Sequence, residues 1–280
     1  MKHIATVALA LCVALILSCS DVADETVATA EQSQTQLVSN FTVTNGSVQL
    51  PPDATHLCHA TKFTCSGAHL NLPPIGFGVY TDGGWLHVGA SSTTVPGYAV
   101  ALPNYTSGQN AKGNCRVDVQ CDQWANFHGT AGGVSPETEM HWFYSGGSPA
   151  FENGAVTMAW GLDVACFISH TYGMSNVGER VEIIPGAVGG WNWQLQVAGF
   201  RSIAGSSRCA WLGRPVQAWQ FLQATPSGPG ISTISPSNGV CFITDMEGVV
   251  DDGTVRIVGN PMRLEAVGQV TKAKAACTTY

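Results

Sequence analysis

Apolar and polar residues alternate along several stretches of the chain, as they do in strands that have one buried face. The clearest stretch is 191–197, in which Trp191, Trp193, Leu195 and Val197 are separated by amide side chains. Successive side chains of a strand point to opposite faces of the sheet, so these four residues would share a buried face. No long stretch has the periodicity of a helix. The pattern predicts an all-β protein made of antiparallel units, sandwich-like or barrel-like.

Two similar patterns follow each other in the second half of the chain. Each begins with a Cys-Phe-Ile phrase, at Cys166 and at Cys241, and has a glycine at the same place after it. A Val-x-Ile stretch, an alternating stretch and a closing cysteine follow in the same order, and the closing cysteines are Cys209 and Cys277. This order predicts two tandem β units, residues 135–211 and 212–280.

A weaker version of the pattern lies earlier in the chain. The spacing from Cys58 to Trp85 is the same as that from Cys166 to Trp193, and a Gly-Gly-Trp phrase occurs in both places. The residues between do not align, and this region has additional cysteines. We therefore expect residues 53–134 to form a Cys-rich N-terminal β module, which would be a degraded third copy of the unit.

The N-terminal residues have the pattern of an export signal. An apolar run extends from Ile4 to Leu17 after the basic Lys2. Its length suits the apolar part of a signal peptide and is short of the roughly 20 residues that a membrane-spanning helix needs. A signal-peptidase-like site near Ala30 would fit plain secretion.

The run ends in Ile16-Leu17-Ser18-Cys19, which resembles the lipobox of bacterial lipoproteins. The resemblance implies removal of residues 1–18 as a signal peptide, lipidation of Cys19 and attachment to a membrane through the lipid. Ser20 at the next position resembles lipoproteins of the outer membrane. Residues 19–52 are polar and rich in Thr and Gln, and such segments bury too little apolar surface to offset their ordering entropy. We expect them to form a flexible tether.

Export leads to an oxidising compartment, in which cysteines form disulfides. If each unit closes on itself, two bridges are predicted: Cys166–Cys209 and Cys241–Cys277. Two arrangements stay open for the other four cysteines: Cys58–Cys121 nested around Cys65–Cys115, or two short local bridges.

Charge narrows the classes of partner. Only 11% of the residues are charged, against about a quarter in average proteins, and the net charge is −7. Phosphate binding needs clustered Lys and Arg, so nucleic acid is excluded as a partner. No segment after the signal is long and apolar enough to cross a membrane.

Candidate metal ligands occur in two places. Asp245, Glu247, Asp251 and Asp252 gather four carboxylates of the kind that bind calcium, although an acidic hairpin tip with Asp252-Gly253 as its turn explains them equally. A second cluster has the spacing that zinc favours and consists of His56, His59, Cys58, Cys65 and His69. Disulfide formation would remove its two cysteines, so we predict no metal and no cofactor.

Catalytic signatures are missing from the sequence. It has no Gly-x-Ser-x-Gly elbow, no His-Glu-x-x-His motif, no P-loop and no dinucleotide-binding glycine pattern, and we assign no catalytic residue. Eight tryptophans are present. Four of them lie at alternating or unit-equivalent positions typical of core residues: Trp142, Trp191, Trp193 and Trp219. An exposed tryptophan among the others could stack on a sugar.

The repeated Cys-Phe-Ile, Gly, Val-x-Ile and Cys order of residues 142–280 resembles uncharacterised cysteine-bearing β repeats of bacterial surface proteins and of phage-tail or pilus-tip-like proteins. The resemblance implies display of a β scaffold outside the cell. We expect an exported cell-surface protein with a non-enzymatic role in recognition or adhesion, toward an extracellular glycan or protein. Two alternatives remain: a secreted hydrolase or hydrolase accessory module, and a structural envelope lipoprotein.

Overall fold

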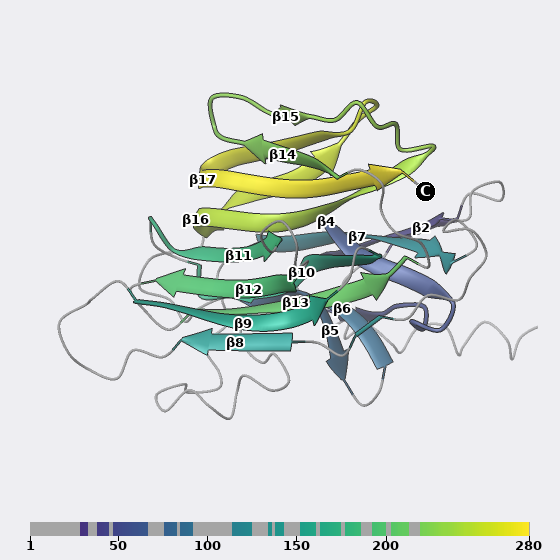
Figure 1. The fold of residues 1–280 in the computed structure, drawn as a ribbon, viewed down its shortest axis with the longest axis horizontal. Helices are drawn as coiled ribbons and strands as arrows, with labels where there is room; N and C mark the ends of the chain where they lie inside the picture. The colour runs from purple at the N-terminus through teal and green to yellow at the C-terminus, as the bar shows by residue number, and fades with distance from the viewer. Residues whose placement is uncertain are drawn as a thin grey trace, which may run out of the picture.

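The computed structural model describes residues 29–32, 38–44, 47–66, 76–82, 85–91, 114–124, 134–135, 138–142, 152–160, 163–174, 177–185, 192–199, 203–212 and 219–279. These residues form strands joined by turns, without an α-helix among them, and the pairs of strands that they form are antiparallel (Figure 1). The prediction of an all-β fold with antiparallel sheets is confirmed.

The described strands are, in chain order, β1 (Thr29–Gln32), β2 (Val38–Thr44), β3 (Ser47–Gln49), β4 (His56–Ser66), β5 (Gly76–Asp82), β6 (Trp85–Ser91), β7 (Asn114–Gln123), β8 (Thr138–Trp142), β9 (Glu152–Trp160), β10 (Val164–Tyr172), β11 (Arg180–Pro185), β12 (Asn192–Gly199), β13 (Ile203–Trp211), β14 (Gln220–Ala224), β15 (Gly230–Ile231), β16 (Gly239–Val258) and β17 (Arg263–Thr279).

One pairing pattern occurs three times along the described chain. In the first unit, strands β2 to β7, β4 pairs with β7 and β5 with β6. In the second, β8 to β13, β10 pairs with β13 and β11 with β12. In the third unit, β14 to β17, the long strands β16 and β17 form both pairings. Their outer parts pair as β4 and β7 do in the first unit, and their inner parts pair as β5 and β6 do. Each unit also places its first strand (β2, β8 or β14) against the strand that closes it.

The registers of these pairings agree among the three units. The paired cysteine positions are Cys58 with Cys121, Cys166 with Cys209, and Cys241 with Cys277. The corresponding apolar pairs of the inner hairpins are Val79 with Val88, Ile183 with Leu195, and Ile257 with Leu264. The Val-x-Ile stretches and the alternating stretches therefore form paired strands, as their sequence pattern predicts.

Short strand pairings join the units in a ring. Each uses a residue at the same distance after the first cysteine of one unit and a residue in the inner hairpin of another: Thr171 with Phe77, Met246 with Val181, and Phe63 with Val255. The first unit thus pairs with the second, the second with the third, and the third again with the first. Figure 1 shows one of these junctions, in which β17, β16, β11 and β12 lie side by side.

The ring explains the sheet order. One sheet has six strands in the order β3-β6-β5-β10-β13-β8, and its members come from the first and second units. The other two junctions run together into one 11-stranded sheet because β16 takes part in both, and β17 joins that sheet by pairing with β16. Residues of all three units also share the main core cluster, which includes Phe63, Leu195 and Val255. The three segments are therefore structurally interdependent.

The start of the folded part differs from the prediction. Strands β1, β2 and β3 lie within residues 19–52, which we predicted to be a tether, so that prediction is wrong for the described residues 29–32, 38–44 and 47–50. Phe41 packs against the core and Leu50 is buried. The polar composition of this segment conceals one apolar side chain, Phe41, that reaches the core from β2.

The strand registers of the first unit differ by one residue from the sequence alignment that we proposed for residues 53–134. Matching the registers of β5 and β6 to those of β11 and β12 places Leu86, opposite Thr81, at the position that Trp193 occupies opposite Pro185. Trp85 is therefore one residue out of step with Trp193. A shift of one residue changes the face of a strand on which a side chain lies.

The disulfides agree with the predicted self-closure of each unit. Cys166–Cys209 and Cys241–Cys277 are bonded, as the order of the two patterns predicts. Cys58–Cys121 is bonded as well, which selects the nested arrangement over two local bridges. Cys65 is disulfide-bonded, and its opposite residue in the β4–β7 register is Cys115.

Two of the tryptophans expected in the core are described with their side chains. Trp193 is buried, and Trp219 packs edge-on against it with ring centroids 5.7 Å apart. Trp211 is 38% exposed. The Trp142 side chain and Trp191 lie outside the described residues. The described part of the chain contains no helix that is long and apolar enough to cross a membrane.

Candidate binding cleft and its polar support

Three rings meet where the three units come together. They belong to the residue that follows the first cysteine of each unit: His59, Phe167 and Phe242. Phe167 and Phe242 stack at a centroid distance of 5.3 Å, and His59 lies edge-on to them at 6.1 and 4.9 Å. The first unit therefore places an imidazole where the other two place a phenyl ring.

A carboxylate accompanies this imidazole. Asp122 Oδ2 lies 3.4 Å from His59 Nε2, and both side chains are buried, with relative exposures of 0% and 1%. The positions in the other units that correspond to Asp122 hold Ala210 and Thr278. The polar pair is thus confined to one unit.

Gln120 extends the polar pair along the same face of β7. Its Nε2 donates hydrogen bonds to both carboxylate oxygens of Asp122, at 2.9 and 3.0 Å. A glutamine amide has two N–H donors and one carbonyl acceptor. Both contacts come from one nitrogen, whose two N–H bonds diverge, so one N–H is shared between the two oxygens; the carbonyl oxygen Oε1 and the second N–H are the groups that Gln120 can offer to another molecule.

Gln120 also lines a cleft of about 280 Å³ between the first and third units. The other residues of its wall come from β2, β4, β16 and the turns that flank β16: Asn40, Thr61, Pro236, Gly239, Val240, Cys241, Ile257, Val258, Gly259 and Met262. None of these lining residues carries an ionisable side chain, apart from Cys241, which is disulfide-bonded.

The cleft lies where two paired strands separate. Strands β16 and β4 are paired from Thr254 to Arg256, and Arg256 lies opposite Lys62. Beyond that pair, Ile257 and Thr61 both line the cleft. Thr61 sits at an irregularity of β4, between Ala60 and Lys62, where the register with β7 shifts. Such bulges bend a strand and redirect its side chains.

Each polar side chain of the cleft provides a hydrogen-bond acceptor. The Thr61 hydroxyl donates to the Asp118 carbonyl at 3.2 Å, so its lone pairs remain for a ligand. Gln120 offers Oε1, as described above. Asn40, which is exposed and lies opposite Gln120 in the register, can both donate and accept. The remaining wall is mainly apolar.

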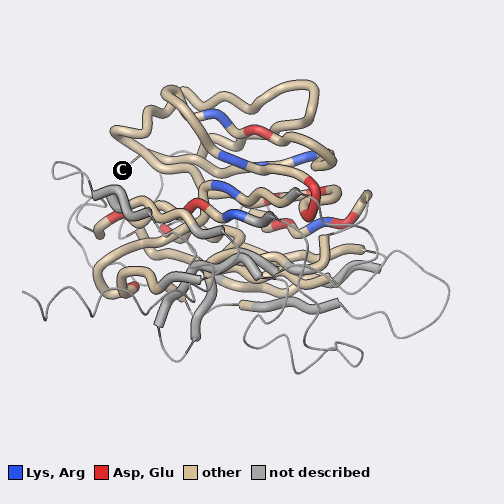
Figure 2. Tube along the Cα trace, turned by 180° about the vertical axis from the view of Figure 1, so that it is seen from behind, with Lys and Arg blue, Asp and Glu red and all other residues tan. Residues whose placement is uncertain are grey.

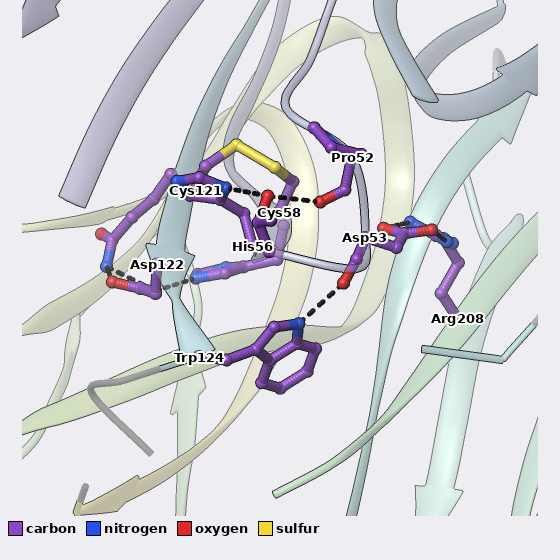
Figure 3. Close-up of a disulfide and its surroundings, with 11 residues drawn as sticks. Pro52, Asp53, His56, Cys58, Cys121, Asp122, Trp124 and Arg208 are labelled. Atoms are coloured by element: carbon purple, nitrogen blue, oxygen red, sulfur yellow. Dashed lines mark hydrogen bonds and ion pairs between the residues drawn. A yellow bond between two sulfur atoms is a disulfide. The ribbon is translucent and has the colours of Figure 1, made fainter. Parts of the chain in front are cut away.

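A second polar cluster lies beside the Cys58–Cys121 disulfide (Figure 3). The Arg208 guanidinium is buried and forms a two-pronged ion pair with Asp53, with Nη1 3.1 Å from Oδ1 and Nη2 closer still to Oδ2. Trp124 Nε1 donates to the Asp53 carbonyl at 2.7 Å. Figure 3 shows Asp53 lying between these two side chains. The cluster ties the turn before β4 to the second unit.

His56 lies at the edge of this cluster. Its Nδ1 is 2.7 Å from the Thr55 hydroxyl, which in turn donates to the Pro52 carbonyl at 3.1 Å. Burial lowers the pKa of His56 from its ordinary value, and the charge of Asp122 raises it in part. The hydrogen bonds that run from His56 through the Thr55 hydroxyl to the Pro52 carbonyl stabilise the local conformation of residues 52–56.

The predicted zinc candidates do not form a metal site. Cys58 and Cys65 are disulfide-bonded, and His59 faces the two phenylalanines. His69 lies outside the described residues. In the described part of the chain, no group of three or more His, Cys, Asp or Glu residues is arranged to hold a metal ion.

The predicted calcium candidates are directed to different partners. Asp245 and Glu247 face the lysines Lys272 and Lys274, and Asp252 accepts a hydrogen bond from Gln269 at 2.6 Å. Asp251 is buried, with its backbone N–H bonded to the Met174 carbonyl. Figure 2 shows these basic and acidic stretches close together on neighbouring strands.

The alternative interpretation of this acidic segment as a hairpin tip is wrong. Asp252 and Gly253 lie inside β16, where the register with β17 jumps from Gly248 to Gly253. The turn between β16 and β17 comes later, at Gly259–Met262. An Asp-Gly pair favours a turn, but here the extra residues form a bulge within a long bent strand.

Sequence reasoning missed Gln120, Asp122 and the cleft. A signal was present, because aligning the first cysteines of the three units exposes His59 in a column that otherwise holds phenylalanine. The predicted lipidation residue Cys19 and the predicted signal peptide lie outside the described residues. Comparison with protein-family models, with curated proteins and with solved structures gave no match.

Proposed function

We propose that this chain is an exported recognition protein that binds a small neutral ligand rich in hydroxyl groups, such as one unit of a glycan, in the cleft between its first and third units. The observation that carries the proposal is the chemistry of the cleft wall, in which amides and a hydroxyl stand among apolar side chains without an ionisable group. Neutral acceptors of this kind complement the hydroxyl groups of a sugar.

The size of the cleft supports a small ligand. Small-molecule sites usually have volumes of about 300–1,000 Å³, and this cleft lies just below that range. A single sugar unit at the end of a longer glycan would fit such a site better than an extended chain. The apolar wall, with Ile257 and Met262, suits the less polar face of a sugar ring.

The cleft favours recognition over hydrolysis. Glycoside hydrolysis uses two carboxyl groups on either side of the scissile bond. The residues that line this cleft provide none, and the nearest carboxylate in the hydrogen-bond network, Asp122, is buried behind Gln120. We therefore prefer a binding role to the hydrolase alternative.

The proposal also includes the location of the protein. The lipobox-like residues before Cys19 support a lipid anchor, and the disulfides fit an oxidising compartment. Mass spectrometry of the mature chain should find a diacylglyceryl group on Cys19. An intact or differently processed N-terminus would exclude the anchor and leave the cleft proposal standing.

The matching registers support a further part of the proposal, that the three units are copies of one repeated β element. The cysteine pairs, the inner hairpins and the junctions all recur at corresponding positions.

A glycan-binding screen tests the cleft. The full chain, purified in detergent, is applied to an array of neutral, acidic and basic glycans, and affinities are then measured by titration calorimetry. We expect binding of neutral glycans and a loss of about tenfold in affinity for Gln120→Ala, which removes one ligand hydrogen bond. Gln223→Ala, at an exposed glutamine of β14 outside the cleft, is the matched control and should bind normally. Binding that Gln120→Ala leaves unchanged would refute the site.

A further inference from the structure

We infer that His59 and Asp122 are positioning residues for the cleft: they fix the amide of Gln120 in one orientation, so that its carbonyl oxygen is held as an acceptor for a hydroxyl proton of the ligand. This inference rests on the proposed function for the identity of the ligand. The fixed orientation of Gln120 can be tested without any ligand.

The other units show that the fold itself does not require this polar pair. At the place of His59 they have Phe167 and Phe242, which stack on each other. At the place of Asp122 the second unit has Ala210, a small apolar residue. Three apolar residues at these junction positions would pack with the same backbone registers.

Retention of the pair carries a cost in stability. Moving a carboxylate and an imidazole out of water is unfavourable, and replacing buried polar pairs by apolar residues is often neutral or stabilising. Asp122 is 0% and His59 1% exposed. Their mutual contact at 3.4 Å and the two hydrogen bonds from Gln120 are among the interactions that offset this cost. A polar pair that the fold does not need points to a role at the neighbouring cleft.

The chemistry of the pair determines the orientation of Gln120. A carboxylate accepts hydrogen bonds and cannot donate them when ionised, so only the Nε2 side of the amide can face Asp122. One N–H is shared between its two oxygens, which prevents the amide from turning over, and Oε1 is left as a fixed acceptor beside the second N–H. A ligand hydroxyl that meets Oε1 must therefore donate its proton.

The position of Gln120 is used differently in the other units. Arg208 takes its place in the second unit and is engaged by Asp53, and Ala276 takes it in the third. Of the three, only Gln120 lines the described cleft. The first unit therefore differs from the other two units at His59, Gln120 and Asp122 together, and these three residues belong to one site.

The double variant His59→Phe/Asp122→Ala tests the inference, because it introduces the residues of the second unit. Nuclear magnetic resonance follows the side-chain N–H signals of Gln120, assigned by their loss in Gln120→Ala. In the wild-type chain we expect slow exchange with water and strongly shifted signals. In the double variant, these signals should exchange at least tenfold faster, while thermal unfolding stays cooperative. Signals that behave like those of a free glutamine in the wild-type chain, or that do not change in the double variant, would overturn the inference.

Binding provides the second arm. The probes are a neutral glycan selected in the array and its derivatives with single hydroxyl groups O-methylated. The wild-type chain should reject one O-methyl derivative by about tenfold, and the double variant should lose most of this discrimination. Equal discrimination by both proteins would contradict the positioning role. If no neutral glycan binds, the proposed function fails, and the amide exchange still decides the orientation of Gln120.

His59→Phe alone is the informative single change. It leaves the Asp122 carboxylate buried without the imidazole, which should destabilise the chain more than the double variant does. Recovery of stability in the double variant would show that the two residues act together. A double variant less stable than either single variant would indicate that the pair serves the core and would count against the inference.

Discussion

At the scale of single residues, Asp245 is a described carboxyl group whose surroundings oppose its ionisation. It is buried on β16, with Lys272 Nζ at 3.5 Å and Lys274 Nζ at 3.3 Å from its Oδ2. Burial, followed by the nearby Glu182 carboxylate, raises the pKa of Asp245 from 3.8 to about 6, although the two lysines pull it down. The folded chain therefore holds a proton on Asp245 that the unfolded chain releases at lower pH.

This difference predicts a stability that depends on pH. Between pH values of about 4 and 6 the native state binds more protons at Asp245 than the unfolded state, so this residue's contribution to the free energy of unfolding falls as the pH rises through that window. Asp245→Asn imitates the protonated form. Relative to the wild-type chain, it should gain about 2 kcal/mol more at pH 7.5 than at pH 4.5. Urea titrations at the two pH values measure the gain, and an equal effect at both would contradict the raised pKa.

Single residues also mark the limit of what the sequence could predict. The pairs Cys166–Cys209 and Cys241–Cys277 follow from the repeated order of the chain, because neighbouring copies should close alike. The contact of His59 with Asp122 does not follow. It depends on which faces of β4 and β7 point inward at the junction, and no local pattern specifies that.

At the scale of elements, β16 is distinctive because it passes from one junction of the ring to the next, pairing with β11 at Met246 and with β4 at Val255. Gly248 lies at the bend of β16 and has a positive φ of 104°. Its N–H bonds to the Glu179 carbonyl of the second unit at 2.9 Å. A Cβ atom at this place would lie 2.6 Å from the Gln269 carbonyl oxygen and 2.7 Å from the Thr271 nitrogen, so only glycine fits.

Replacement of this glycine should therefore be costly. Gly248→Ala combines an unfavourable φ with two backbone clashes, and we expect a loss of about 2–3 kcal/mol in the free energy of unfolding. Gly228→Ala is the control, since nothing lies within 4 Å of the added Cβ and no positive φ is involved. It should change stability by less than about 0.5 kcal/mol. Denaturant unfolding of both variants measures the difference, and similar losses would refute the explanation.

The strands themselves were largely predictable, whereas their continuity was not. The alternation at 191–197 and the Val-x-Ile stretches predict β12, β11 and part of β16. The Asp-Gly pair at 252–253 favours a turn on local grounds and in fact lies within β16, because pairing with β17 on both sides of the bulge continues the strand. Tertiary pairing here overrides local turn chemistry.

At the scale of the whole molecule, the ring of junctions makes the units depend on one another. The third unit has its own disulfide, yet it presents Met246 and Val255, both fully buried, to the other two units. An isolated unit would expose these residues together with unpaired strand edges. Exposed edges and apolar surface favour aggregation over folding.

This dependence predicts the behaviour of fragments. Residues 215–280 expressed alone should lack cooperative unfolding and dispersed amide signals even with Cys241–Cys277 intact. Mixing with residues 20–214 should restore both, because the junctions at β11 and β4 become available again. Calorimetry and amide spectra of the fragments and of the mixture provide the measurement. A fragment that folds alone would show that the unit is an autonomous domain.

The ring closure could not be inferred from the sequence. Two units were visible as similar patterns and the third as a weaker one, but the pairings of Thr171 with Phe77 and of Phe63 with Val255 join residues far apart in the chain. No spacing within a unit specifies its neighbour. The cleft could not be predicted for the same reason, because its walls come from the first and third units.

The placement of the disulfides has a consequence for motion. The bridges Cys58–Cys121, Cys166–Cys209 and Cys241–Cys277 lie inside units, whereas the strand pairing at each junction between units extends over three residue pairs without a covalent link. The lowest-energy opening of the molecule should therefore be breathing at the junctions, with each unit moving as a stapled body. The cleft begins where the β4–β16 junction ends, at Arg256 and Lys62. Ligand entry and junction breathing would then be one motion, and an occupied cleft would act as a clasp between the first and third units.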